Sequence, residues 1–152
     1  MSAKIVNVVG YAKEENQFVV KAQNFDVRIS KNERYVELDG PSPIEYILAG
    51  YAGCINAVGK LVAKEQGIEL KSLQVELSAT LSLDKYQGKI SNERAGFSSI
   101  EVIVKPTSDA SLEQLKQWLI TIEDRCPIQD NLINPTPVSV VLFKDFETIE
   151  AA

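Results

Sequence analysis

The 152 residues are 45% hydrophobic and 24% charged, with a net charge of -5 and no histidine. This composition is typical of one soluble globular domain spanning residues 1–152, and its acidic balance argues against nucleic acids or anionic membranes as partners. The lack of histidine excludes Ser-His-Asp and Cys-His catalysis and histidine-containing metal sites, and two cysteines cannot form a four-cysteine metal site in one chain. Any chemistry therefore rests on thiols, carboxylates, arginine or tyrosine.

The first part of the chain predicts three strands. Lys4–Val9 is rich in β-branched residues, and Gln17–Ala22 follows a polar turn at 14–16. Phe25–Ile29 alternates between apolar and polar residues, as a half-buried strand does. Together these segments predict an antiparallel meander. The charged segment 31–39 then predicts a loop or a short edge strand.

A long helix is predicted next, from Ser42 to about Gln66. Ser42 is placed to cap it, Pro43 suits its first position, and Glu45 completes a capping box. Gly67 suits the position just after its end. The helix is apolar or small on nearly all sides, which indicates burial, and its alanines and glycines allow another backbone to come close. A thiol, Cys54, lies near its centre.

The middle of the chain predicts a β-hairpin. Leu70–Leu83 alternates between apolar and polar residues over a long span, and Phe97–Lys105 returns as a strand with Ile100, Val102 and Val104 on one face. The polar segment Asp84–Gly96, with two glycines, is the expected hairpin loop, and 106–109 is expected to break the second strand.

Two further helices and a strand are expected in the last third. Ser111 and Gln114 form a second capping box, before a helix that ends near Arg125. The pair Cys126-Pro127 marks the start of a short helix through Leu132. Val138–Phe143 is the final strand, followed by an acidic tail. This order of elements predicts an α+β fold with mainly antiparallel sheets around a long buried helix.

We also expect a cytoplasmic protein. The longest uncharged run, Tyr46–Gly59, is shorter than the roughly 18 apolar residues that a spanning helix needs. The N-terminal sequence MSAKIVNVVG has no hydrophobic core of signal-peptide length.

The two cysteines allow a structural and a chemical interpretation. A free cysteine is often an ordinary buried residue, and Cys54 suits that description. Cys126, however, lies at a helix start beside Arg125, where the helix dipole and the guanidinium are both expected to favour a thiolate. In a cytoplasmic protein, two thiols fit a transient catalytic disulfide better than a structural one. The spacing of 72 positions alone leaves both interpretations open.

A resemblance to a known family favours the chemical interpretation. Residues 41–54, PSPIEYILAGYAGC, resemble the start of the cysteine-bearing helix in the OsmC/Ohr family of osmotically inducible and organic hydroperoxide resistance proteins. Residues 125–128, RCPI, resemble the family's downstream Cys-Pro element. The order of strands and helices agrees over nearly the whole chain. The resemblance implies the OsmC-like fold and an intertwined homodimer, with active sites at the subunit interface.

The resemblance also implies an activity, the thiol-dependent reduction of small organic hydroperoxides. Cys54 would be the peroxidatic residue and would become a sulfenic acid. Cys126 would be the resolving residue, which forms a disulfide with Cys54. An external dithiol, of the dihydrolipoyl type in the family, would reduce that disulfide, so no bound cofactor and no metal are expected.

The family also places an arginine and a glutamate near the peroxidatic thiolate. Burial opposes a thiolate, so a cation must compensate. Arg34 stands where one branch of the family has its arginine, and Arg28 is the second candidate; either is also explained as a solvated charge. The family's glutamate directly follows the proline, but that position is Ile44 here, and Glu45 comes one residue later. Glu45 is either the functional replacement or only a helix cap.

Two further interpretations remain. In one, the protein is a dimeric OsmC-like protein that binds a small apolar or thiol-bearing molecule with little or no peroxidase activity, and Ile44 in the glutamate position favours it. In the other, both cysteines are purely structural, and the Cys-Pro helix start is a coincidence.

Overall fold

The structure is a computed structural model of the chain, and it describes residues 4–14, 17–22, 25–30, 41–144 and 147–150. The segment 31–39, predicted as a loop or edge strand, lies outside these residues. Ten helices and strands are assigned in this part of the chain, and every strand pairing in it is antiparallel. The predicted α+β class is therefore confirmed.

The N-terminal meander consists of β1 (Val8–Glu14), β2 (Gln17–Ala22) and β3 (Phe25–Ser30), paired in that order. The meander is confirmed, but the predicted bounds of its first strand were wrong. β1 begins at Val8 and continues to Glu14, where a polar turn was expected. An irregularity between Ala12 and Glu14 shifts the register, so that backbone pairing reaches Glu14 opposite Gln17 despite the polar sequence.

The long helix α2 (Pro43–Glu65) forms as the sequence predicts, but in this single chain it is buried on one side only and not, as expected, nearly all round. Ser42 is its N-cap, Pro43 occupies the first helical position, and the capping box with Glu45 is complete. At the other end, Gly67 adopts a φ of 68°, a left-handed conformation that favours glycine. Local sequence signals thus fix both ends of the helix that carries Cys54.

A long hairpin follows, made of β4 (Ser72–Leu81) and β5 (Phe97–Thr107). β5 continues through Pro106, where a break was expected. Thr107 directs its carbonyl towards the backbone N–H of Lys71, so the neighbouring Pro106 directs its nitrogen to the outer edge of the hairpin. The missing N–H of proline therefore costs no hydrogen bond between the strands.

The C-terminal part comprises α3 (Leu112–Arg125), α4 (Pro127–Ile133), β6 (Val141–Lys144) and β7 (Glu147–Glu150). The capping box of Ser111 with Gln114 is present, as predicted. The final strand starts three residues later than expected and pairs with β7, which was not predicted. Its sequence ETIE resembles an acidic tail, and only the β-branched residues Thr148 and Ile149 favour a strand.

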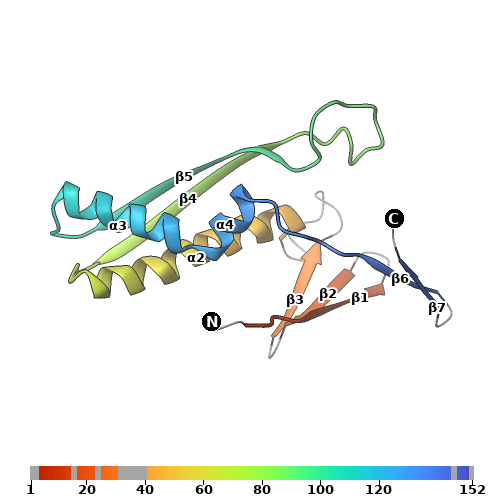
Figure 1. Cartoon of the computed structure of the whole chain (residues 1–152), viewed down its shortest axis with the longest axis horizontal. Helices are drawn as coiled ribbons and strands as arrows, with labels where there is room; N and C mark the ends of the chain where they lie inside the picture. Colours follow the sequence, from red (N-terminus) through yellow and green to blue (C-terminus); the bar gives the residue numbers. More distant parts are fainter. Residues whose placement is uncertain (1–3, 15–16, 23–24, 31–40, 145–146, 151–152) are drawn as a thin grey trace.

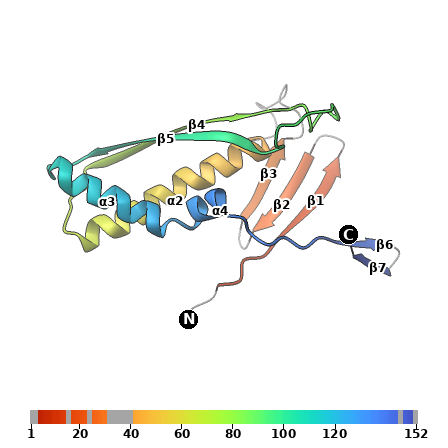
Figure 2. The same cartoon turned by 45° about the horizontal axis from the view of Figure 1, so that its top comes forward.

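The core lies where α2, α3 and the hairpin meet. Figures 1 and 2 show α3 beside α2, with β4 and β5 running along both helices. The fully buried side chains include Trp118, Ile122, Val62 and Cys126. Among the described residues, α2 is long and apolar enough to cross a membrane by length and composition, but its buried side chains pack in this core.

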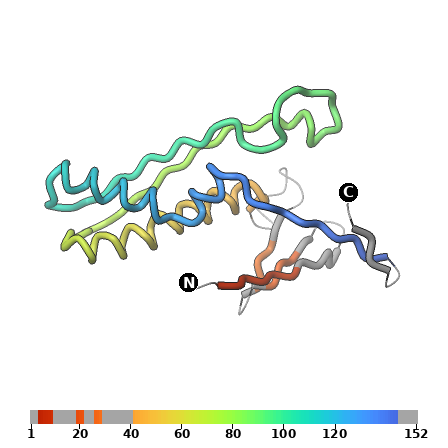
Figure 3. Tube along the Cα trace, in the orientation of Figure 1, coloured from red at the N-terminus to blue at the C-terminus, as the bar shows by residue number. Residues whose placement is uncertain are grey.

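The meander is set apart from that core. In Figures 1 and 2 it projects from the N-terminal half of α2, away from the β4–β5 hairpin, and the trace in Figure 3 follows the same path. The hydroxyl of Tyr46 on α2 donates a hydrogen bond of 2.7 Å to the carbonyl of Arg28 on β3. The face of α2 that carries Gly50, Gly53 and Ala57 is exposed in this single chain, and we call it the open side of α2.

Candidate functional site

Cys54 lies on the border between the buried and the open side of α2. Its thiol is half-buried and packs against the hydrophobic core, whereas Gly53 beside it is exposed. Tyr51 and Ile55, on the inner side of the helix, are buried. Helical periodicity thus leaves the Cys54 sulfur within reach of both the core and the surface.

Cys126 joins α3 to α4 and lies directly against Cys54. Its side chain is 1% exposed, and its Sγ–H donates a hydrogen bond of 2.8 Å to Cys54 Sγ. Both thiols are free. Because a disulfide bond is about 2.05 Å long, the two sulfurs need only a small approach to bond. The fold therefore brings together two cysteines that are 72 positions apart in the sequence.

The surroundings of Cys126 raise the pKa of its thiol above the ordinary value. Burial raises the pKa of Cys126, and the hydrogen bond that it donates to Cys54 raises this pKa further. The backbone N–H groups of Gln129 and Ile128, in the first turn of α4, lower the same pKa and offset part of this effect. The expectation that Cys126 favours a thiolate was therefore wrong.

Arg125 does not serve Cys126 in the way that the sequence suggested. Its guanidinium forms two hydrogen bonds to the carboxylate of Glu65, the longer of them 3.1 Å, and so links α3 to the end of α2. This pairing lowers the pKa of Glu65. Arg125 is next to Cys126 in the sequence, but its side chain extends towards α2 and not towards the Cys126 sulfur.

A second contact between α2 and α4 lies beside the thiols. Tyr51 is 7% exposed, and its hydroxyl donates a hydrogen bond of 2.8 Å to Gln129 Oε1. Burial is the main cause that raises the pKa of Tyr51, and the negative charges possible on Cys126, Glu123 and Cys54 add to it. Tyr51 therefore remains a neutral hydrogen-bond donor at physiological pH.

Sequence reasoning did not assign a role to this Tyr51–Gln129 pair. Spacing offered a signal, since Tyr51 precedes Cys54 by three residues and Gln129 follows Cys126 by three. Residues three apart share one side of a helix, which places Tyr51 beside Cys54, and an N-cap residue lies close to the third residue of its helix, which places Gln129 beside Cys126.

Glu45 takes part in the helix cap. Its carboxylate accepts hydrogen bonds from the Ser42 backbone N–H at 2.8 Å and from the Ser42 hydroxyl at 2.7 Å, which lower the pKa of Glu45. Nine residues separate it from Cys54, which is two and a half helical turns and about 13 Å along the axis. In one chain the two side chains thus leave α2 in opposite directions, and a catalytic role for Glu45 stays a prediction.

The two candidate arginines differ in what the structure describes. Arg34 lies outside the described residues, so its predicted role beside Cys54 stays a prediction. Arg28 is exposed on β3, and its backbone carbonyl accepts the hydrogen bond from Tyr46. No group of metal-ligating side chains occurs among the residues that the structure describes.

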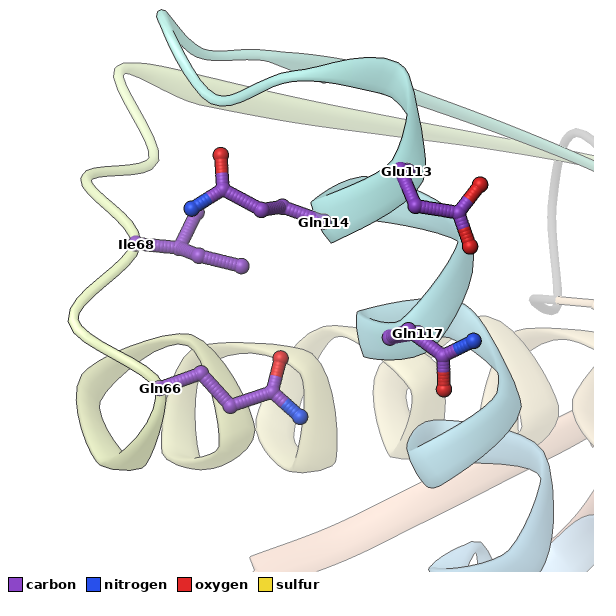
Figure 4. A pocket seen from close by; sticks show the side chains of 5 residues that line it. All are labelled: Gln66, Ile68, Glu113, Gln114 and Gln117. Carbon is purple, nitrogen blue, oxygen red and sulfur yellow. The ribbon is translucent and has the colours of Figure 1, made fainter.

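One cavity of the structure lies far from the thiols. It has a volume of about 190 Å³ and is lined by Gln66, Ile68, Glu113, Gln114 and Gln117, as Figure 4 shows. It lies between the end of α2 and the start of α3. Gln66 is twelve residues beyond Cys54, or about 18 Å along the helix. This cavity therefore does not belong to the thiol site.

Comparisons with known proteins agree with this fold. Residues 36–141 match the family model described as OsmC-like protein. The organic hydroperoxide resistance protein OhrB of Bacillus subtilis is 29% identical over 104 residues, which cover 68% of this chain and 70% of that protein.

Solved structures extend the agreement to three dimensions. An OsmC-like protein from Mycoplasma pneumoniae superposes with a TM-score of 0.76 at 19% identity, covering 86% of this chain and 89% of that one. The crystal structure of B. subtilis OhrB gives a TM-score of 0.57 at 21% identity, covering 86% and 91%. At these identities the superpositions establish the fold alone. Together with the family model, which covers most of the sequence and includes both cysteines, they show that this chain belongs to the OsmC-like protein family.

Proposed function

We propose that this protein is a thiol peroxidase that reduces organic hydroperoxides. The observation that carries the proposal is the 2.8 Å contact between the free thiols of Cys54 and Cys126, from two separate helices. The relative named as an organic hydroperoxide resistance protein adds support.

In the first step, the Cys54 thiolate attacks one oxygen of the hydroperoxide. An S–O bond forms, the O–O bond breaks, and the alkoxide takes up a proton and leaves as an alcohol. Cys54, now oxidised, is a sulfenic acid. The half-buried position of Cys54 suits this role better than the fully buried position of Cys126.

In the second step, the Cys126 sulfur attacks the Cys54 sulfur. The hydroxyl group of the sulfenic acid leaves as water with the proton of the Cys126 thiol, and a disulfide forms. An external dithiol of the dihydrolipoyl type then reduces this disulfide by two exchanges and becomes a disulfide itself. The overall reaction converts one hydroperoxide and one dithiol into an alcohol, water and an oxidised dithiol.

The proposal includes a homodimer, for which the surface of the single chain argues. The chain exposes 12,261 Å², whereas a compact monomer of 16.8 kDa exposes about 7,600 Å². Exposed apolar side chains occur on α2, β1 and β6, among them Ile47, Leu61, Val9 and Phe143. The excess is larger than the roughly 1,000 to 2,500 Å² that each subunit of an obligate dimer buries, so the chain has ample surface for such an interface.

The site near Cys54 would be completed by this assembly. A second chain that packs on the open side of α2 would contact the exposed part of the Cys54 side chain and complete the walls of the site. A cation beside the thiolate is still required, and Arg34 is its proposed source.

A peroxide consumption assay tests the activity. Reduced protein is mixed with cumene hydroperoxide and dihydrolipoamide, and the loss of peroxide is followed. We expect turnover by the wild type, none by Cys54→Ser, and a single turnover without an intramolecular disulfide by Cys126→Ser. Hydrogen peroxide in place of cumene hydroperoxide tests the preference for organic substrates.

The alternative is a binding protein for a small apolar or thiol-bearing molecule. The half-buried Ile44 in the position of the family's glutamate favours it, as does the engagement of Glu45 in the helix cap. Under this alternative, wild type and Cys54→Ser give the same negligible peroxide consumption, and that result would reject the peroxidase proposal.

A further inference from the structure

We propose that Tyr51 and Gln129 are positioning residues, whose hydrogen bond holds Cys126 against Cys54 so that a disulfide forms before Cys54 is oxidised further. The inference rests on the proposed function for its catalytic consequence. Its structural part, the positioning of one thiol against the other, can be measured independently of peroxide turnover.

Two contacts join α2 to the start of α4. They are the hydrogen bond from Tyr51 to Gln129 and the contact between the sulfurs of Cys54 and Cys126. On α2 the two contacting residues are three positions apart, or about one turn, whereas Cys126 is the N-cap of α4 and Gln129 is its third residue. Two contacts separated by one turn restrict both the distance between the helices and their rotation, which one contact alone does not.

The starts of α3 and α4 are held in different ways. Each has a glutamine at the third helical position. In α3, Gln114 Oε1 accepts a hydrogen bond of 2.9 Å from the N-cap backbone N–H of Ser111. In α4, no side-chain hydrogen bond caps the helix at Cys126, and Gln129 Oε1 instead accepts the Tyr51 hydroxyl. The start of α4 is thus held by a residue of α2 in place of its own cap.

The helix α4 is too short to be stable without contacts to the rest of the chain. This helix has seven residues, and none of them is buried. Helices of this length are unstable without tertiary contacts, so the position of its first turn depends on the contacts that it makes. That turn includes the N–H groups of Ile128 and Gln129, which act on the Cys126 sulfur. Loss of the Tyr51 hydroxyl would therefore loosen the surroundings of the resolving thiol.

The test compares how Cys54 is partitioned between two oxidised products. Wild type and Tyr51→Phe are treated with increasing cumene hydroperoxide, and mass spectrometry measures the ratio of Cys54–Cys126 disulfide to Cys54 sulfinic acid. We expect Tyr51→Phe to lower this ratio about fivefold, the effect of one neutral hydrogen bond. Because a ratio of products is measured, the rate of the first step does not affect it.

Tyr46→Phe is the matched control. Tyr46 lies on the same helix and donates a hydrogen bond of similar length, but to the Arg28 carbonyl on β3, so its loss leaves α4 unaffected. We expect the wild-type ratio for this variant. Emission from the single tryptophan, Trp118, which is buried, reports whether each variant is folded.

A double-mutant cycle separates a shared function from two independent packing defects. Gln129→Leu removes the acceptor, and we expect it to lower the ratio as Tyr51→Phe does. The double variant should be no worse than either single variant, because the same bond is lost in all three. Gln129→Glu retains an acceptor oxygen and is expected to restore a ratio near that of the wild type. Additive losses in the double variant would overturn the proposal.

A redox equilibrium makes failure of this inference distinguishable from failure of the peroxidase proposal. Each protein is equilibrated with dithiothreitol and its oxidised form, which takes two electrons and two protons from the thiols as their disulfide forms. We expect a fivefold smaller equilibrium constant for disulfide formation in Tyr51→Phe, or about 20 mV in reduction potential. A wild-type protein without turnover but with this shift would reject only the peroxidase proposal. Unchanged potential and product ratio in Tyr51→Phe would reject the positioning role.

Discussion

Trp118 covers Gly59 and donates its indole Nε1–H to the glycine's carbonyl oxygen at 2.8 Å. The contact joins α3 to the buried side of α2 in the centre of the core. A Cβ atom added at Gly59 would lie 3.1 Å from a ring carbon of Trp118 and 3.3 Å from Ile122 Cδ1. The close approach of a neighbouring helix thus leaves little room for a side chain at this position.

Replacement of Gly59 by alanine is therefore expected to destabilise the fold. Alanine favours the helix by about 1 kcal/mol relative to glycine, whereas overpacking a filled core costs about 1 to 3 kcal/mol. We expect a net loss of about 1 kcal/mol in the free energy of unfolding, measured by urea denaturation with Trp118 fluorescence. The same change combined with Trp118→Phe, followed by circular dichroism, should cost less than the sum of the two single changes. An unchanged or raised stability of Gly59→Ala would contradict the packing argument.

The glycines on the open side of α2 predict the opposite behaviour in a single chain. A Cβ added at Gly53 meets no atom within 4 Å in this chain, so Gly53→Leu should not harm an isolated protomer. If two copies pack through this side of α2, the leucine obstructs their approach. We therefore expect Gly53→Leu to shift the protein from dimer to monomer in sedimentation velocity experiments.

Lys116→Leu on α3 is the control for this experiment. Lys116 is also exposed on a helix, so this variant adds a leucine to the surface without changing the open side of α2. It should remain dimeric. Equal behaviour of the two variants would remove the support for an interface at Gly53.

Local signals in the sequence were sufficient to predict most of the fold. The capping boxes at Ser42 and Ser111 and the alternation in β4 and β5 depend on neighbouring residues, and the structure has each of them. The strand ends were less predictable. β5 passes through Pro106 because the nitrogen of this proline points to the outer edge of the hairpin, where no hydrogen bond to β4 is lost. Which edge a residue faces depends on the pairing of the two strands, and the composition of the segment does not reveal it.

The candidate site was only partly predictable, since it depends on side-chain directions between distant elements. The sequence identified Cys54 and Cys126 as candidate reactive cysteines, but their spacing of 72 positions could not predict that the two sulfurs are in contact. Arg125 was expected beside the Cys126 sulfur, and it turns to Glu65 instead. This difference arises because α3 and α2 run side by side, which brings a carboxylate within reach of the guanidinium.

The protonated state of Cys126 predicts an effect of alkaline pH on stability. The folded chain raises the pKa of Cys126 above its ordinary value of 9.0, so the folded state retains a proton that the unfolded state releases. The resulting stabilisation is complete below pH 9 and is lost as the pH rises through the folded pKa. We expect the wild type to lose stability in urea as the pH is raised above 9, and Cys126→Ser to lose less. Parallel curves for the two proteins would contradict this expectation.

Ile44 provides the most direct test of how this chain departs from the family pattern. It is half-buried in the first turn of α2, in the position where the family's glutamate is expected. The N-terminal turn of a helix favours a negative charge, so Ile44→Glu should be tolerated there. In the proposed mechanism, a carboxylate in this position would orient the arginine that supports the Cys54 thiolate.

We therefore expect Ile44→Glu to raise kcat/KM for cumene hydroperoxide about tenfold, the effect of one hydrogen bond to a charged group. Ile47→Glu is the matched control. It places the same charge one turn later on α2, at a residue that is 43% exposed, and should not increase the rate. Glu45→Gln distinguishes the two roles proposed for that residue: loss of turnover at unchanged stability would indicate a catalytic role, whereas loss of stability alone would indicate a helix cap. If Ile44→Glu is no faster than the wild type, the missing carboxylate is not what limits the proposed peroxidase activity.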